Sequence, residues 1–151
     1  MIQGKWFSPG DDLTSVLSVR EAVLGYGADQ LDPESWNVLV FEDSIPAATG
    51  RIWWKDGSFW LGDIAVLEGC RGRHLGDLVL RLLLYKAQSH SAREVRLRCP
   101  RSLTGFFARL GLQEPAVSDD PVAEMIIAGN QIDLDTCSRC PKQNCPNRHP
   151  G

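Results

Sequence analysis

The feature that most constrains this chain is an apolar strand followed by a short basic loop and an amphipathic helix. Residues 59–66 form an apolar run of strand length, and a loop containing Gly69, Arg71, Gly72 and Arg73 follows it. Beyond the loop, aliphatic residues recur at the spacing of one helix face, namely Leu75, Leu78, Val79, Leu82 and Leu83. The first turn of a helix has unpaired N–H groups and the positive end of the helix dipole. This arrangement therefore predicts a phosphate-binding site, whose positive field Arg71 and Arg73 strengthen.

The remaining sequence predicts one domain in which strands and helices alternate. The length of 151 residues suits a single domain. Strands are expected at residues 4–8, 36–41, 47–54, 59–66, 94–99 and 122–128, and helices from about residue 12 to 25, from 75 to about 90, and from 103 to 110. The second helix makes its two flanking strands a parallel pair by the usual crossover. The expected fold class is therefore α/β (α+β), with a mixed, mostly antiparallel central sheet and helices on both faces.

Charge and hydropathy exclude several kinds of partner. The formal net charge of −3 disfavours a nucleic acid held by bulk electrostatics. No apolar run approaches the roughly 18 residues of a transmembrane helix, so no membrane partner is expected. The first residues lack the apolar core of a signal peptide, which favours a cytoplasmic location, where thiols are kept reduced.

Three stretches of the chain resemble one known family. Residues 71–76, Arg-Gly-Arg-His-Leu-Gly, resemble motif A of the GNAT superfamily of acyl-CoA-dependent N-acetyltransferases, usually written Gln/Arg-x-x-Gly-x-Gly/Ala. Residues 106–112, Phe-Phe-Ala-Arg-Leu-Gly-Leu, resemble the phrase Phe-Tyr-x-x-x-Gly-Phe of the same family. Residues 13–24, which contain Arg20, resemble its first helix. The order of elements agrees along residues 1–130.

The resemblance implies acetyl-CoA as co-substrate and assigns residues to it. Backbone groups of Ile64, Ala65 and Val66 would pair with the pantetheine arm of the coenzyme. The loop and first helical turn would hold its pyrophosphate; these residues are Arg71, Gly72, Arg73, His74, Leu75, Gly76 and Asp77. Strands 59–66 and 94–99 are implied to splay apart around the acetyl thioester. The acceptor would be a small-molecule or peptide amine, and the protein could form a homodimer.

Two residues depart from the family pattern and bear on different steps. His74 stands where motif A has its middle glycine, and it still offers a backbone N–H to the pyrophosphate. Phe107 stands where the family has a tyrosine that commonly protonates the departing thiolate. A thiol has a pKa of about 8.5, so the thiolate can also leave without an acid.

The residue that accepts the proton of the amine is predicted less directly. Asp63, Glu68 and Glu21 are candidate bases, and Asp63 is favoured because it precedes the pantetheine-binding residues and shares a strand face with Ala65. The alternative for Asp63 is a structural role, in which it caps a bulge or pairs with an arginine, and this is the commoner role for a carboxylate at such a position. Cys99 either lines the acyl site or packs in the core. Trp53, Trp54 and Trp60 straddle a Lys-Asp-Gly hairpin; at least one faces the core, and the others are candidate walls of a substrate groove.

The last residues carry a second pattern. Cys137, Cys140, Cys145 and His149 offer four ligands within thirteen residues, a set that zinc accepts. An iron–sulfur cluster, a disulfide or a free tail remain alternatives. We therefore divide the chain into a GNAT-like domain at residues 1–132 and a Cys-rich tail at residues 133–151.

The sequence thus predicts an N-acetyltransferase that moves an acetyl group from acetyl-CoA to a primary amine by direct attack. The alternative is a non-catalytic acyl-CoA-binding or metal-sensing module. The acceptor is not readable. Acidic residues around the first helix slightly favour a cationic acceptor, but solvated surface charge explains them equally well; they are Glu21, Asp29, Asp32 and Glu34.

Overall fold

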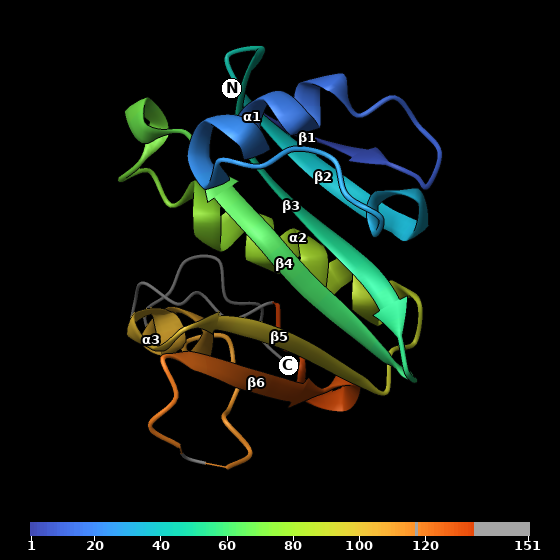
Figure 1. Ribbon diagram of the computed structural model, residues 1–151, viewed down its shortest axis with the longest axis vertical. Coiled ribbons are helices and arrows are strands. Elements are labelled where there is room, and N and C mark those ends of the chain that lie inside the picture. Colours follow the sequence, from blue (N-terminus) through green and yellow to red (C-terminus); the bar gives the residue numbers. More distant parts are fainter. Residues whose placement is uncertain (117, 135–151) are drawn as a thin grey trace, which may run out of the picture.

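One six-stranded sheet organises the fold (Figure 1), and a computed structural model describes it over residues 1–116 and 118–134. The strands lie in chain order β1-β2-β3-β4-β5-β6. All neighbours are antiparallel except β4 and β5, which are parallel because helix α2 connects them. The elements are β1 (Ile2–Phe7), α1 (Thr14–Leu24), β2 (Ser35–Glu42), β3 (Ile45–Lys55), β4 (Ser58–Val66), α2 (Leu75–Ser89), β5 (Glu94–Pro100), α3 (Thr104–Ala108) and β6 (Val122–Ala128). The predicted fold class is confirmed.

Helices cover both faces of the sheet. In Figure 1, α1 lies in front of the sheet and α2 behind it. Helix α2 packs close to β3 because Gly50 has no side chain: a Cβ there would lie 2.7 Å from a methyl of Val79 and 3.0 Å from one of Leu83. The two faces therefore bury separate apolar clusters, a large one under α2 and a smaller one under α1.

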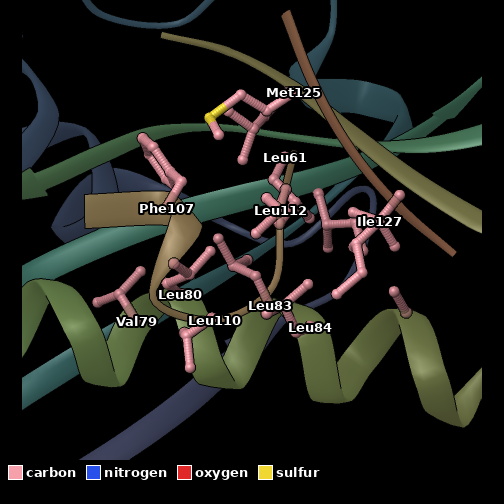
Figure 2. Packing of buried hydrophobic residues seen from close by; sticks show 14 of the residues in the cluster. Leu61, Val79, Leu80, Leu83, Leu84, Phe107, Leu110, Leu112, Met125 and Ile127 are labelled. Atoms are coloured by element: carbon pink, nitrogen blue, oxygen red, sulfur yellow. The ribbon is translucent and has the colours of Figure 1, made fainter. Parts of the chain in front are cut away.

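The larger cluster joins the two halves of the sheet. Figure 2 shows the aliphatic face of α2 turned toward the sheet, with Leu61 of β4 and Met125 and Ile127 of β6 beyond it. Phe107, Leu110 and Leu112 close this core from the α3 side. Val79 and Leu83 of the predicted helix face have no exposed surface, whereas Leu78 and Leu82 are only partly buried. Leu80 and Leu84, which lay outside the predicted spacing, are fully buried, so the core-facing side of α2 is shifted from the predicted one.

The structure extends or shortens several predicted elements. The first strand is Ile2–Phe7 rather than 4–8, and β3 runs one to two residues farther at each end than predicted. The helix expected at 103–110 is a 3-10 turn, Arg101–Leu103, followed by the five-residue α3. The Lys-Asp-Gly hairpin is confirmed: Asp56 and Gly57 both have positive φ, as a two-residue turn between twisted strands requires.

The described chain continues past the last strand and packs on α2. Ile132 is buried, its carbonyl accepts a hydrogen bond from Gln88, and Leu134 contacts the core. The packed domain therefore includes the first two residues that the sequence assigned to the tail. Within the described residues, no helix is long and apolar enough to cross a membrane.

Candidate active site

The parallel strands β4 and β5 pair only over their first halves. Phe59, Trp60 and Leu61 pair with residues 95–97, and no later residue of β4 pairs with β5. Figure 1 shows the two strands together at the lower right and diverging toward the left. The predicted splay is thereby confirmed. On its β5 side, β4 beyond Leu61 presents backbone groups that no strand among the described residues occupies, which is an edge to which an extended ligand can add.

A β-bulge lies where the strands separate. Residue Arg51 of β3 is opposite Gly62, whereas Thr49 is opposite Ala65, so β4 has one extra residue in this interval. Asp63 occupies the bulge with φ 54°, a left-handed conformation that is uncommon for a side chain other than glycine. The bulge bends β4 away from β5 and turns the Asp63 carboxylate toward Arg51.

The loop after β4 ends in a helix without a capping side chain. Helix α2 begins at Leu75, and among the described residues the backbone N–H groups of residues 72–77 have no hydrogen-bond acceptor. Space around the loop is open: a Cβ on Gly72 meets nothing within 4 Å, and one on Gly76 makes only ordinary contacts at 3.7 Å. Six free donors at the positive end of a helix make an anion-binding site.

Ion pairs beside this loop offset charges of both signs. The Arg71 Nε donates to the carbonyl of Val66 at 3.2 Å. The Arg73 guanidinium pairs with Glu42 at the end of β2, which offsets the positive charge that Arg73 was predicted to add to the loop. Asp77 is the acid in the first turn of α2, and its carboxylate accepts from Arg81 Nε at 2.8 Å. The carboxylate that would repel a bound phosphate is therefore neutralised within its own helix.

His74 explains the glycine of the family motif. Its φ of 63° and ψ of 25° place it in the left-handed region immediately before α2. Its side chain is exposed, so it does not cover the N–H groups of the loop. Histidine is tolerated in this region more readily than bulky or β-branched residues. The substitution therefore changes local strain and leaves the donor geometry in place.

Asp63 is held by two neighbours on the α1 side of the sheet. Its carboxylate accepts hydrogen bonds from Arg51 Nε and from the Tyr26 hydroxyl. Burial, together with the hydrogen bond to Asp63, raises the pKa of Tyr26 to about 12. Tyr26 therefore stays protonated and donates to Asp63. The predicted base thus has an arginine partner, and each of its oxygens keeps one further acceptor site.

A buried network of charged residues fixes Arg51, the arginine that binds Asp63. Arg51 is 3% exposed, and it also binds the Asp29 carboxylate through two nitrogens at 2.6 and 2.7 Å. Asp32 joins Arg51 to Arg20 of α1, at 3.1 and 2.8 Å respectively. The hydrogen bonds from Arg51 lower the pKa of Asp29 to about 2. Burial alone would raise the pKa of Asp32, but the bonds from Arg20 and from the backbone of Asp29 lower it.

This network corrects one expectation and reveals residues that the sequence did not single out. The sequence allows Asp29 and Asp32 either to favour a cationic acceptor or to be solvated surface charges, but both are paired with buried arginines. Arg51 was not among the predicted site residues. Its position inside an otherwise apolar strand could have indicated a role, since a charge in a buried strand requires a carboxylate partner.

The remaining predicted residues are placed as follows. Phe107 is 7% exposed, and its ring packs edge-on against the ring of Phe106 with the centroids 4.9 Å apart. The Phe107 ring is therefore part of the core. Cys99 is buried with its Sγ 3.9 Å from the sulfur of Met125, and burial raises the pKa of its thiol. The core alternative is therefore confirmed for Cys99. The ligands Cys137, Cys140, Cys145 and His149 lie outside the described residues, and the described residues hold no cluster that fits a metal ion.

The geometry defines a class of protein: an α/β sheet whose splayed parallel strands lead into an anion-binding loop, as a phosphate-bearing extended ligand requires. The chain belongs to the acetyltransferase (GNAT) family, whose model matches residues 9–112. The family match thus agrees with the resemblance seen in the sequence and with the observed fold.

Individual relatives agree with this assignment. A glucosamine 6-phosphate N-acetyltransferase 1 from Oryza sativa subsp. japonica is 33% identical over 110 residues, which cover 64% of this chain and 61% of that relative. An acyl-CoA N-acyltransferase from Pseudomonas aeruginosa has the same fold, with a TM-score of 0.75 at 20% identity over 85% of this chain and 100% of that one. A GNAT acetyltransferase from Elizabethkingia anophelis, solved with acetyl-CoA bound, has a TM-score of 0.68 at 12% identity, over 84% and 97% of the two chains.

Proposed function

We propose that this protein transfers the acetyl group of acetyl-CoA to a primary amine. One observation carries the proposal: within the described residues, the edge of β4 beyond Leu61 is unpaired, and a short turn connects it to a loop whose N–H groups at residues 72–77 have no acceptor. An extended arm that ends in phosphates matches both parts, because the arm can add to the strand edge while the phosphates accept from the loop. Ile64, Ala65 and Val66 would hold the pantetheine, and residues 71–77 the pyrophosphate.

The reaction that fits this arrangement is a direct transfer. The neutral amine nitrogen attacks the thioester carbonyl, a C–N bond forms, and the C–S bond breaks as coenzyme A leaves as a thiolate. The nitrogen loses one proton, and the thiolate takes up one proton from solvent. The splay between β4 and β5 orients the two reactants, and the chain's role is to hold them and to accept the proton of the amine.

Asp63 is the group that we propose for this last role. It lies in the bulge at the point where the splay opens, on the face that α1 partly covers. The Arg51 and Tyr26 contacts fix its carboxylate while leaving acceptor sites free. Through these sites it can accept a hydrogen bond from the neutral amine and receive the one proton that the nitrogen loses on attack, directly or through a water molecule.

The replacement Asp63→Asn tests this role. It is nearly isosteric but cannot accept a proton, so we expect kcat/KM to fall by about a hundredfold. The stabilisation by acetyl-CoA should be unchanged. A fall of less than about threefold would contradict a base at Asp63, and Glu68→Gln would serve as the matched comparison.

A turnover screen separates catalysis from mere binding. The protein is mixed with acetyl-CoA and an amine panel, with release of free thiol and the acceptor's mass as readouts. We expect one class of amine to gain the mass of an acetyl group with equimolar thiol release. The rival, a non-catalytic acyl-CoA-binding module, predicts a raised melting temperature with acetyl-CoA and no acetylated product from any amine.

The tail and the cell location remain proposals from the sequence. We propose that Cys137, Cys140, Cys145 and His149 bind one zinc ion, with an iron–sulfur cluster as the alternative. Truncation after Leu134 keeps the residues that pack on α2, so metal analysis of the full and truncated chains tests the tail alone. Equal metal content in both would reject it. A cytoplasmic location agrees with the two free thiols of the described region, Cys70 and Cys99, and a homodimer is testable by light scattering.

A further inference from the structure

A small pocket lies on the sheet face next to Asp63. Its volume is about 160 Å³, and it is lined by Leu31, Trp53, Lys55, Trp60 and Arg98. Trp53 and Trp60 are directly opposite each other on β3 and β4, so their rings lie side by side on one face. Cavities of about 150 Å³ accommodate one benzene-sized group. The pocket therefore has room for part of a small acceptor and not for a whole coenzyme.

One residue of the pocket lining, Trp53, also contacts the neighbours of Asp63. The Trp53 ring lies over Gly62, where a Cβ would come within 2.9 Å of it, and Gly62 is the neighbour of Asp63. The Arg51 guanidinium, which binds Asp63, stacks on the same Trp53 ring at 5.4 Å. Arg98 lies one residue beyond Leu97, the last residue of β5 that pairs with β4. The pocket thus opens at the mouth of the splay, on the side opposite α2.

Hydrogen-bond donors dominate the polar lining of this pocket. In the described part of the chain, neither Lys55 nor Arg98 forms an ion pair. Glu124 is opposite Arg98 on β6, but its carboxylate is paired with Arg96 at 3.8 Å. Trp60 has a buried indole N–H, for which no described residue provides an acceptor. A buried donor without a partner calls for an explanation, and an oxygen-rich ligand group supplies one.

We propose that this pocket binds an anionic oxygen group, a carboxylate or a phosphate, carried by the acetyl acceptor itself. Arg98 and Lys55 would pair with the anion, the Trp60 N–H would donate to it, and the two indole rings would cover the carbon skeleton. The amine of the same molecule would then lie at Asp63. The acceptor is therefore a small molecule with a primary amine at one end and a negative charge at the other. This inference rests on the proposed acetyl transfer and names its substrate class.

The test uses pairs of acceptors that differ only in the anion. Glucosamine 6-phosphate is compared with glucosamine, and a linear amino acid with its carboxamide, using the full chain saturated with acetyl-CoA. We expect kcat/KM to be about tenfold or more higher for the anionic member of at least one pair, because a hydrogen-bonded charge pair discriminates by that factor. The phosphate and carboxylate pairs tell which anion the pocket prefers.

Variants connect the preference to the pocket. Arg98→Gln should lower kcat/KM about tenfold for the anionic acceptor, mainly through KM, and leave its neutral partner unchanged. Arg98→Lys keeps the charge and should recover most of the loss. Arg93→Gln removes the same charge from the other end of β5, where the side chain is exposed, and should change neither acceptor. Binding is measured independently by tryptophan fluorescence. Trp60→Phe should weaken binding of the anionic acceptor, and Trp54→Phe should not.

Three outcomes would overturn the proposal. They are equal kcat/KM within both pairs, an equal loss for both members on Arg98→Gln, and absence of any fluorescence response to both anionic acceptors. The melting temperature with acetyl-CoA is recorded for every variant. If that shift is present while the anion preference is absent, the pocket proposal fails and the proposed function stands; if the shift is absent in the native protein, the proposed function fails.

Discussion

At the scale of single residues, His74 shows how a motif position can change without loss of its geometry. Its left-handed backbone is the reason that glycine is usual there, since L-residues lose roughly 1–2 kcal/mol in this conformation. The side chain is exposed, and no described residue accepts a hydrogen bond from the loop N–H groups, so the strain is local.

The variants His74→Gly and His74→Val measure this strain. Glycine relieves it but gives the unfolded chain more freedom, so we expect the free energy of unfolding to stay within about 1 kcal/mol of the native value. Valine is β-branched and should lower it by about 1–2 kcal/mol. Urea denaturation provides both values. Equal stability of the two variants would mean that residue 74 does not hold the left-handed conformation in solution.

At the scale of elements, the segment between α1 and β2 is held by charges rather than by apolar packing. Asp29 and Asp32 of this segment are tied to Arg51 of β3 and Arg20 of α1. The segment also carries Tyr26, which donates to Asp63, and Leu31, which lines the proposed acceptor pocket. The network therefore positions one wall of the pocket and the proposed base together.

Removal of Arg51 should expose this dependence. Arg51→Met leaves three carboxylates without their shared cation, and breaking a buried pair in this way costs about 3 kcal/mol or more of unfolding free energy. Arg96→Met is the matched control, because Arg96 forms a partly exposed pair with Glu94 and should cost about 1 kcal/mol or less. Denaturant titration at neutral pH measures both. A cost below that of Arg96→Met would contradict a supporting role for the network.

The same network predicts how stability varies with pH. The pKa of Asp29 is lowered to about 2 in the folded protein, against an ordinary value of 3.8. The stabilisation is therefore complete above about pH 5 and is lost as the pH falls toward 2, because the unfolded chain binds the proton first. In Arg51→Met, unfolding free energy should decline less steeply between pH 5 and pH 2 than in the native protein. Parallel curves would show that Arg51 does not hold this carboxylate.

The sequence predicted those features that arise from local patterns. The leucine spacing in residues 75–83, the hairpin at Asp56 and the crossover to β5 each follow from periodicity, turn chemistry or handedness, and all are present. The structural alternative for Asp63, a bulge or an ion pair with an arginine, is present in both forms. The sequence could name this alternative but could not establish the bulge, because its position depends on the register of β3 against β4. The pairing of Asp29 with Arg51 was missed for the same reason, since 22 positions separate the partners.

At the scale of the whole molecule, the two faces of the sheet have different tasks. The face under α2 is apolar and holds β6, α3 and the end of the described chain to one core. The face under α1 carries the charge network and the tryptophan-lined pocket. Between them, the β4 edge and the α2 loop form the proposed coenzyme site, so that donor and acceptor approach Asp63 from different sides.

The central claim is that acetyl-CoA binds along β4 and at the start of α2, and the melting temperature tests it most directly. At about a hundred times Kd, a ligand adds about 2.7 kcal/mol, which raises the melting temperature of a domain this size by roughly 5–10 °C. Gly76→Glu adds a carboxylate in the first turn of α2, where an added Cβ makes only ordinary contacts at 3.7 Å and a negative charge favours the helix. It should therefore fold normally and lose the shift, because the carboxylate repels the pyrophosphate.

Tyr85→Glu is the control, since it adds the same charge to an exposed position farther along α2. We expect a shift of several degrees for the native protein and for Tyr85→Glu, and none for Gly76→Glu. An equal shift in all three, or none in the native protein at millimolar acetyl-CoA, would contradict the central claim.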